Sequence, residues 1–357
     1  SGSDEHKSKP TQHSVKELQG MGVSPDIIVL RCDEPLEESI FNKISMFCNV
    51  KPDCVFENMT LSNLYEVPIM LEKKNFSAVV CRELGITTPE PDLRDWMKML
   101  DMIKCRNREV NIGLVGKYVQ LHDAYLSVAE SLRHAGYPLE AYVNISWIDS
   151  ETLTEENYRE ILSPLDGILV PGGFGGRGIE GMILAAKYAR ENNVPYFGIC
   201  LGMQIAVIEF TRNVAEIKDA NSGEFDEICK NKVIDFMPGQ SDNIDKGGTL
   251  RLGSYPCVIA PNTTMERCYK TNLINERHRH RYEFNNNFRD ILTEKGLTIS
   301  GTSPDGRLVE TVELSDRPFF VGVQFHPEFK SRPDKPHPLF LGFVAASLEN
   351  RTERGRQ

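Results

Sequence analysis

Apolar runs and helical periodicities alternate along the chain from residue 110 onward. The predicted strands cover 110–115, 140–148, 168–170 and 194–199, of which the last is an apolar run expected to be buried, and the predicted helices cover 124–134 and 178–192. Such alternation indicates a largely parallel sheet with helices on both faces, in which active sites lie at the carboxyl ends of strands. We therefore predict an α/β fold, with a mostly parallel sheet flanked by helices, for residues 110–350.

The chain before this region is less regular. Residues 1–84 contain one strong apolar run, at 27–32, then a helical pattern at 37–48 and a further short element at 77–84. Because a single strong strand buries little surface, we expect 1–84 to be the truncated end of a larger α/β domain. Ser1-Gly2-Ser3 is set aside as foreign to the fold.

Three further segments are predicted from local composition. Residues 85–109 form a linker, in which two prolines favour extended backbone and a helical pattern follows. The polar and glycine-rich stretch 219–253 predicts a long loop or an insert. The tail, 351–357, is expected to fray.

The composition excludes several classes of function. A net charge of −10 over 357 residues argues against general binding to nucleic acid or to an anionic membrane surface. No stretch approaches the roughly 20 apolar residues that a membrane span needs. The nine cysteines include no C-x-x-C pair, so we predict neither a zinc site nor a redox pair, and we expect a reducing, cytoplasmic setting.

One cysteine is framed by glycines at a predicted strand end. Gly198-Ile199-Cys200-Leu201-Gly202 follows the run 194–199 and precedes a helical pattern, which is the strand–turn–helix context of a nucleophile elbow. Glycines suit this crowded turn because they carry no Cβ beside the nucleophile. The N–H of Leu201 then lies at a helix N-terminus, where it can face an oxyanion.

A base and a carboxylate follow far downstream. His326 and Glu328 are two residues apart, so on an extended strand they would share one side and both reach Cys200. Gly172 and Gly173, directly after the run 168–170, could offer a second N–H to the oxyanion. This set predicts acyl transfer through a thioester, with release of ammonia or an amine and then hydrolysis.

The residues alone leave plainer interpretations open. Cys200 and His326 could be ordinary core residues, Glu224 an ordinary loop carboxylate, and Lys7 and Lys9 part of a basic tail. The charged run 276–283 could be a solvated loop, or a patch for a metal or a phosphate. Its interleaved arginines repel a cation, so no metal is predicted.

Several motifs resemble those of known enzymes. The runs G-I-C-L-G-M-Q at 198–204, P-G-G-F-G at 171–175 and H-P-E at 326–328 resemble class I glutamine amidotransferases of the Cys-His-Glu type. The motifs that narrow the resemblance to the CTP synthase family are G-K-Y at 116–118, R-G-I-E-G at 177–181, G-G-T-L-R-L-G at 247–253, E-R-H-R-H-R-Y-E at 276–283 and K-S-K-P-T-Q at 7–12. Nearly the whole chain is covered by this resemblance.

The resemblance implies roles for the site residues. Cys200 is the nucleophile, His326 and Glu328 complete the triad, and Gly172, Gly173 and Leu201 form the oxyanion hole. The residues implied to hold glutamine are Phe174, Gln204, Glu224 and Arg281. Chemically, Glu224 suits the α-ammonium of glutamine and Arg281 suits its α-carboxylate.

The resemblance also implies nucleotide sites. The residues matched to UTP or CTP binding are Lys7, Lys9, Thr11, Gln12 and Lys43, and those considered for a GTP effector are Thr249 and Arg251. Ser8 stands where the family usually has threonine, and no glycine-rich phosphate loop for ATP is present. ATP, Mg²⁺ and the activator GTP are thus expected for the full-length enzyme, and this chain alone is expected to hydrolyse glutamine without a cofactor.

The expected partners are L-glutamine, the synthetase domain that receives ammonia, and further copies in homotetramers and filaments, but neither nucleic acid nor a membrane. One alternative is another Cys-His-Glu γ-glutamyl hydrolase or amidotransferase subunit, against which the run 276–283 speaks. Another is a catalytically idle assembly module, against which the intact Cys200, His326 and Glu328 speak.

Overall fold

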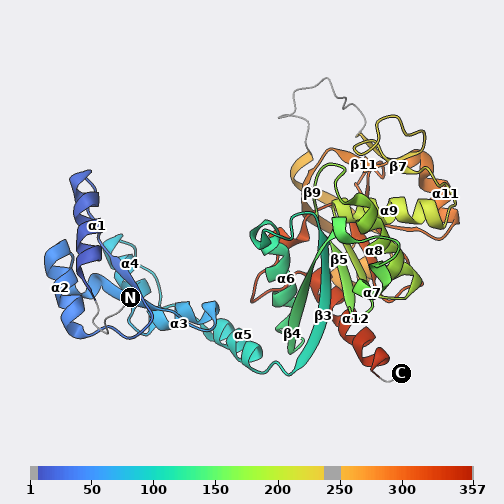
Figure 1. Ribbon diagram of the computed structural model, residues 1–357. Coiled ribbons are helices and arrows are strands. Elements are labelled where there is room, and N and C mark those ends of the chain that lie inside the picture. Colours follow the sequence, from blue (N-terminus) through green and yellow to red (C-terminus); the bar gives the residue numbers. More distant parts are fainter. Residues whose placement is uncertain (1–6, 237–250, 356–357) are drawn as a thin grey trace. The chain divides into compact units, whose positions relative to one another are not determined.

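The structure is a computed structural model that describes residues 7–236 and 251–355 (Figure 1). It divides the chain into two compact units, Ser1–Asp101 and Met102–Gln357. The division falls inside helix α5 (Arg94–Lys104), which the helical pattern after Pro91 predicts. Among the described residues no helix has the length and apolar character needed to cross a membrane.

The first unit is built around two parallel strands. β1 (Ile28–Cys32) pairs with β2 (Val55–Met59), and the helices are α1 (Lys9–Gly20), α2 (Glu38–Cys48), α3 (Val67–Glu72) and α4 (Phe76–Glu83). Val15, Ile28, Ile44 and Val55 belong to its core. The predicted strand and helix at 27–32 and 37–48 are confirmed, whereas β2 was missed because Glu57 and Asn58 interrupt its apolar run.

The second unit contains a nine-stranded sheet in the order β10-β9-β12-β13-β14-β6-β5-β3-β4. These strands are β3 (Arg108–Gly116), β4 (Ala141–Asp149), β5 (Gly167–Val170), β6 (Tyr196–Ile199), β9 (Arg251–Ile259), β10 (Leu273–His280), β12 (Thr298–Thr302), β13 (Val309–Glu313) and β14 (Phe320–Val323). From β14 to β4 all neighbours are parallel, and from β10 to β14 all are antiparallel. The predicted parallel strands are therefore confirmed, and the antiparallel half is an addition to the prediction.

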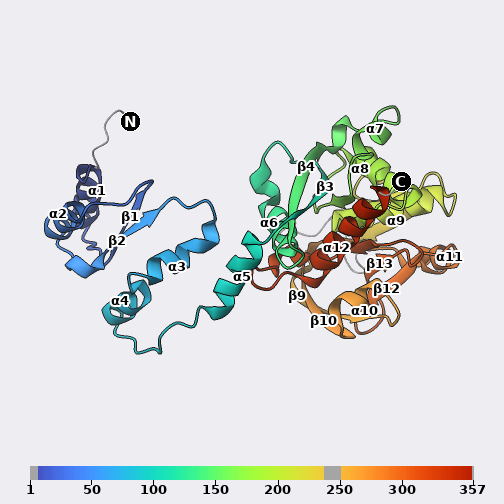
Figure 2. The ribbon, with the colours of Figure 1, turned by 90° about the horizontal axis from the view of Figure 1, so that it is seen from below.

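Helices cover both faces of this sheet (Figures 1 and 2). One face packs against α7 (Tyr158–Leu162), α8 (Ile179–Glu191) and α9 (Leu201–Asn213), and the other against α6 (Leu126–Gly136), α10 (Thr264–Tyr269) and α12 (Pro338–Arg354). Neighbouring residues on one strand, such as Ile168 and Leu169, belong to the two different cores because side chains alternate along a strand. The predicted α/β fold class is confirmed.

A small sheet and the end of the last helix differ from the prediction. β7 (Asn221–Ser222), β8 (Lys232–Phe236) and β11 (Tyr282–Phe284) form a three-stranded sheet, so part of the predicted loop or insert is strand. The helix α12 continues to Arg354, although the tail was predicted to begin at 351. Arg351 pairs with Asp166 at 3.0 Å and Arg354 donates to the carbonyl of Leu165 at 2.6 Å, and these contacts hold the last turn.

Candidate active site

Cys200 lies at a strained turn between β6 and α9. Its backbone has φ 52° and ψ −99°, a conformation that residues other than glycine rarely adopt. A Cβ on Gly198 would lie 2.5 Å from the carbonyl carbon of Gly202, and one on Gly202 would lie 2.1 Å from the carbonyl oxygen of Val170. Both glycines are thus required by close backbone packing, and the predicted nucleophile elbow is present.

His326 and Glu328 are in direct contact, but not as the sequence predicted. Nδ1 of His326 lies 2.7 Å from Oε1 of Glu328, and the two residues sit in a 3₁₀ turn (Pro327–Phe329) after β14 rather than on an extended strand. Pro327 fixes its own φ and favours the turn. Because a carboxylate accepts, Nδ1 carries a proton and donates it to Glu328. Nε2, the other ring nitrogen, then remains to accept or donate a proton in a reaction.

The imidazole of His326 lies beside Cys200 and the glycine loop. A Cβ on Gly172 would stand 2.8 Å from Cε1 of His326 and 3.6 Å from Cβ of Cys200. Burial disfavours the charged imidazole, but Cys200 and Glu328 outweigh burial and raise the pKa of His326 to about 10. Nε2 of His326 is buried and has no hydrogen bond of ordinary geometry within the described residues. Since Nδ1 is hydrogen-bonded to Glu328, Nε2 is the ring atom that can exchange a proton with Cys200 or with a substrate.

The loop after β5 is held from two sides. Nζ of the buried Lys117 donates to the carbonyl of Phe174 at 3.1 Å and also to that of Gly175. The N–H of Gly175 donates to Oε1 of Glu224 at 2.7 Å. Burial lowers the pKa of Lys117 to about 8. These contacts fix the loop that carries Gly172 and Gly173 next to Leu201.

A cavity of about 210 Å³ opens onto Cys200. The structure brings together in its wall all the residues expected to hold glutamine, namely Phe174, Gln204, Glu224 and Arg281. The further lining residues are Gly173, His280 and Tyr282. A carboxylate, a guanidinium and a thiol around one small cavity suit an amino acid with a reactive side chain.

Gln324 is a site residue that the sequence analysis missed. Its Nε2 donates to Sγ of Cys200 at 3.6 Å, and its Oε1 accepts from Nε2 of Gln204 at 3.2 Å. Gln204 also donates to the carbonyl of Tyr282 at 3.1 Å. The sequence signal that could have indicated Gln324 is its position two residues before His326. Its contacts with Cys200 and Gln204 form only when the chain is folded.

Arg251, considered earlier for an effector site, is buried in an ionic cluster. Its guanidinium lies 2.6 Å from Oε1 of Glu310 and 3.4 Å from Oε1 of Glu283. Burial raises the pKa of Glu310 to about 7. Burial, together with Arg251 and neighbouring imidazoles, holds the pKa of His278 far below its usual value.

The charged run 276–283 is not a solvated loop. It spans β10 and β11, and within β10 Glu276, His278 and His280 are buried while Arg277 and Arg279 are exposed. The alternation is that of a strand with one face in the core. In the described part of the chain no group of three His, Cys, Asp or Glu residues is placed to hold a metal ion.

The residues matched to UTP or CTP lie in the first unit. Lys9, Thr11 and Gln12 are on α1, Lys43 is on α2, and Lys7 lies two residues before the start of α1. Lys7, Lys9 and Lys43 are exposed. Thr249 lies outside the described residues.

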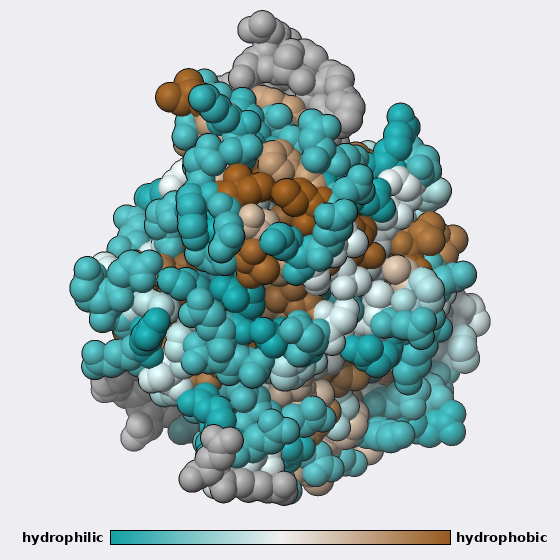
Figure 3. Space-filling model, turned by 90° about the vertical axis from the view of Figure 1, so that its right-hand side faces the viewer, coloured by the Kyte–Doolittle hydropathy of each residue, from teal (hydrophilic) through white to brown (hydrophobic). Residues whose placement is uncertain are grey.

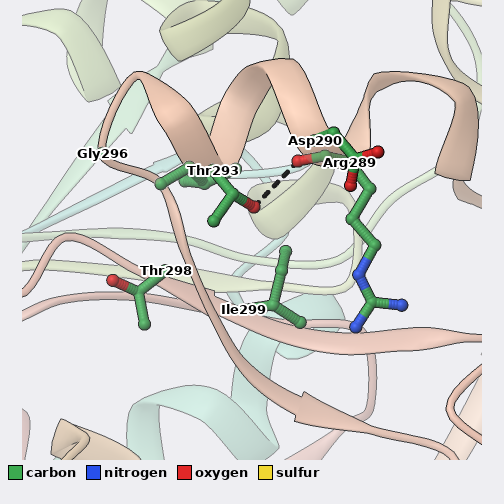
Figure 4. Close-up of a pocket in the computed structure, with 7 residues that line it drawn as sticks. Arg289, Asp290, Thr293, Gly296, Thr298 and Ile299 are labelled. Carbon is green, nitrogen blue, oxygen red and sulfur yellow. Dashed lines mark hydrogen bonds between the residues drawn. The ribbon is translucent and has the colours of Figure 1, made fainter.

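A larger surface cavity, of about 400 Å³, lies beside α11 (Arg289–Glu294). Figure 4 shows Arg289, Asp290 and Thr293 along its helix side, with Thr293 donating to the carbonyl of Arg289 at 2.8 Å. The side of the molecule on which α11 lies in Figure 1 is mostly hydrophilic, with hydrophobic residues gathered toward its centre (Figure 3). This cavity contains no thiol or imidazole, so the cavity at Cys200 is the candidate active site.

Comparison with known families agrees with this geometry. The model of the family "Glutamine amidotransferase class-I" matches residues 120–346, which include the elbow, the glycine loop and the His–Glu pair. The chain therefore belongs to the class I glutamine amidotransferases.

The relatives narrow the assignment. The model "CTP synthase N-terminus" matches residues 1–86. The CTP synthase of Carboxydothermus hydrogenoformans is 58% identical over 97% of this chain and 64% of its own length. That of Ruminiclostridium cellulolyticum is 56% identical over 98% of this chain and 66% of its own length. Within its class the chain is a member of the CTP synthase family, and it spans about two thirds of the length of these relatives.

A solved structure of a glutaminase domain matches a large part of the chain. The Trypanosoma brucei CTPS glutaminase domain with bound acivicin is 43% identical and superposes with a TM-score of 0.64, covering 67% of this chain and 94% of that domain.

Proposed function

We propose that this chain hydrolyses L-glutamine to glutamate and ammonia through a cysteinyl thioester. The observation that carries the proposal is the cavity at Cys200, whose wall holds a carboxylate and a guanidinium and whose thiol adjoins the His326–Glu328 pair. No cofactor is required for this reaction.

The first half-reaction makes the thioester. The Cys200 thiolate attacks the carboxamide carbon of glutamine, and the carbonyl oxygen becomes an oxyanion that accepts hydrogen bonds from the N–H groups of Leu201 and of Gly172 or Gly173. His326 donates the proton from Nε2 to the leaving nitrogen, the C–N bond breaks and ammonia departs. In the second half-reaction His326 takes a proton from water, the resulting hydroxide attacks the thioester, and glutamate and the thiolate are released.

The cavity supplies both charged ends of an amino acid with partners. The guanidinium of Arg281 binds the α-carboxylate, and the carboxylate of Glu224 binds the α-ammonium through Oε2, because its Oε1 accepts from Gly175. Phe174 and Gln204 complete the wall around the substrate chain.

The wider reaction is proposed from the relatives. In the full-length enzyme, the ammonia is used by a synthetase domain that converts UTP to CTP with ATP and Mg²⁺, with GTP as the allosteric activator. Lys7, Lys9, Thr11, Gln12 and Lys43 contribute part of the site for UTP or CTP. The enzyme assembles as a homotetramer and as filaments in the cytoplasm, and the present chain alone releases its ammonia to water.

The test is glutamate release from glutamine by the chain and by Cys200→Ala, each with and without GTP. Release by the parent that is lost in Cys200→Ala supports the proposal, and stimulation by GTP places an effector site within these residues. Release that survives in Cys200→Ala contradicts the mechanism. Preference for γ-glutamyl peptides over glutamine would favour a γ-glutamyl hydrolase. No glutamate release under any condition would favour an assembly module.

A further inference from the structure

Three consecutive residues line one side of the cavity at Cys200. They are His280, Arg281 and Tyr282. On a regular strand, neighbouring side chains point to opposite faces. Here β10 ends at His280 and β11 begins at Tyr282, so the break at Arg281 turns all three residues toward the same cavity. His280 is therefore part of the cavity wall, although the buried side chains before it on β10 face the core.

The orientation of the His280 ring is fixed by Glu283. Nε2 of His280 lies 2.7 Å from Oε1 of Glu283, and both side chains are buried. Since a carboxylate only accepts hydrogen bonds, Nε2 carries the proton and donates it to Glu283. The same oxygen of Glu283 also accepts from Arg251 at 3.4 Å, and Arg251 is in turn paired with Glu310. The buried ionic cluster thus holds the ring in one tautomer.

In that tautomer, Nδ1 of His280 is a hydrogen-bond acceptor. It is buried and no donor reaches it within residues 7–236 and 251–355. The neighbouring amide of Gln204 is already used, since its Nε2 donates to Tyr282 and to Gln324. A buried acceptor without a donor is unfavourable, and a ligand in the cavity can supply the missing donor.

An α-ammonium is the donor-rich group of the amino acid. It has three N–H bonds to satisfy, and Glu224 offers one carboxylate that already accepts from Gly175. We propose that Nδ1 of His280 accepts a hydrogen bond from the α-ammonium of the bound substrate, which makes His280 a residue that selects α-amino acids over amides lacking the amino group. The inference rests on the proposed glutaminase function and extends it by a substrate contact.

The experiment compares two matched variants on two substrates. His280→Gln keeps an N–H near the position of Nε2 and removes the acceptor at Nδ1, whereas His280→Asn keeps an oxygen near the position of Nδ1. The substrates are L-glutamine and glutaramic acid, which is glutamine without the α-amino group. For His280→Gln we expect kcat/KM for glutamine to fall by about tenfold or more, as for one hydrogen bond to a charged group, and kcat/KM for glutaramic acid to stay unchanged.

His280→Asn is expected to retain most of the preference for glutamine. Equal losses on both substrates in His280→Gln would indicate a purely structural role and overturn the inference, as would unchanged kinetics on both. Melting temperatures show whether each variant is folded.

Binding measurements separate this inference from the proposed function. Calorimetric titration of both compounds into Cys200→Ala and into Cys200→Ala/His280→Gln reports the contact without turnover. If the parent binds glutamine but does not hydrolyse it, the proposed function fails, and a selective loss of glutamine affinity in the double variant still supports the contact. If Cys200→Ala binds neither compound, or if the double variant loses no preference for glutamine, the contact is refuted.

Discussion

Cys200 and His326 meet because the strands that precede them are neighbours. β6 and β14 pair in parallel with Ile199 opposite Val323, so the residues that follow both strands emerge at the same edge of the sheet. The N–H of Cys200 donates to the carbonyl of Val323 at 2.7 Å, which closes this edge. The proposed nucleophile and the proposed base are thus positioned by backbone pairing, and the carboxylate of Glu328 is hydrogen-bonded to the imidazole of His326.

The negative charge of Glu328 should contribute to turnover because it stabilises the protonated imidazole of His326. Cys200 and, after it, Glu328 raise the pKa of His326 to about 10, and Glu328→Gln keeps the shape of the side chain but removes the second of these two charges. We expect glutamine turnover to fall by about 10³- to 10⁴-fold, as when the orienting carboxylate of a triad is neutralised. Steady-state kinetics at saturating glutamine measures this, and a loss smaller than tenfold would contradict the role.

The stability difference between the parent and Glu328→Gln should depend on pH. The pKa of His326 is raised in the folded state from 6.5 to about 10, so its stabilising contribution is complete below about pH 6.5 and is lost as the pH rises toward 10. The difference in Tm between the parent and Glu328→Gln should therefore be largest near pH 6 and shrink toward pH 10. A difference that grows with pH would contradict this assignment.

Lys117 should control the glycine loop through its charge. Lys117→Met removes the donor to the carbonyls of Phe174 and Gly175, and we expect kcat to fall by up to about 10²-fold because small displacements of catalytic groups cost that much. Since burial lowers the pKa of Lys117 to about 8, the parent should lose activity above pH 8 as the ammonium loses its proton. A pH–rate profile in which Lys117→Met keeps that limb would refute the assignment.

The turn between β6 and α9 should tolerate no side chain at its glycines. In Gly202→Ala the new Cβ would stand 2.1 Å from the carbonyl oxygen of Val170, whereas in Gly176→Ala the nearest atom would be 4.0 Å away. We expect Gly202→Ala to lose about 1–3 kcal/mol of unfolding free energy or more, because the neighbour is backbone and cannot move aside. Thermal melting of both variants tests this, and equal Tm values would contradict the packing argument.

Strands with continuous apolar runs were predicted, whereas β2 and β10, which have mixed or alternating patterns, were missed. The runs at 168–170 and 194–199 appear as β5 and β6 because both faces of these strands are buried. β10 was not predicted as a strand, since three of its four buried positions are Glu276, His278 and His280, whose polar side chains do not mark a core-facing strand. The His326–Glu328 contact was predicted, but the turn that makes it was not.

Some site residues could likewise be predicted from the sequence, and others could not. Cys200, Phe174, Gln204 and Arg281 lie in recognisable motifs, whereas Glu224 was indicated only by the family resemblance, and the structure brings all five to one cavity. The contributions of Gln324, Lys117 and His280 depend on which atoms surround them, and no local pattern encodes that. A sequence can mark the groups that react with or hold a substrate more readily than the groups that position them.

At the scale of the whole molecule, an exposed segment near the end of the first unit should be open to cleavage. Residues 86–92 contain no helix or strand and are exposed, and they lie between α4 and α5. We expect limited proteolysis to cut there first, because exposed segments without secondary structure are the preferred sites of cleavage. Mass spectrometry of the products identifies the cut.

The larger product should keep the glutaminase reaction. The cavity, the elbow, the glycine loop and the His–Glu pair all lie between residues 171 and 328, inside the unit Met102–Gln357. Glutamate release by the purified larger product should therefore equal that of the intact chain within about twofold, and it should vanish in the same product made from Cys200→Ala. If cleavage at 86–92 abolishes the activity while the Tm of the product is unchanged, the first unit contributes to the reaction and the site is not confined to the second unit.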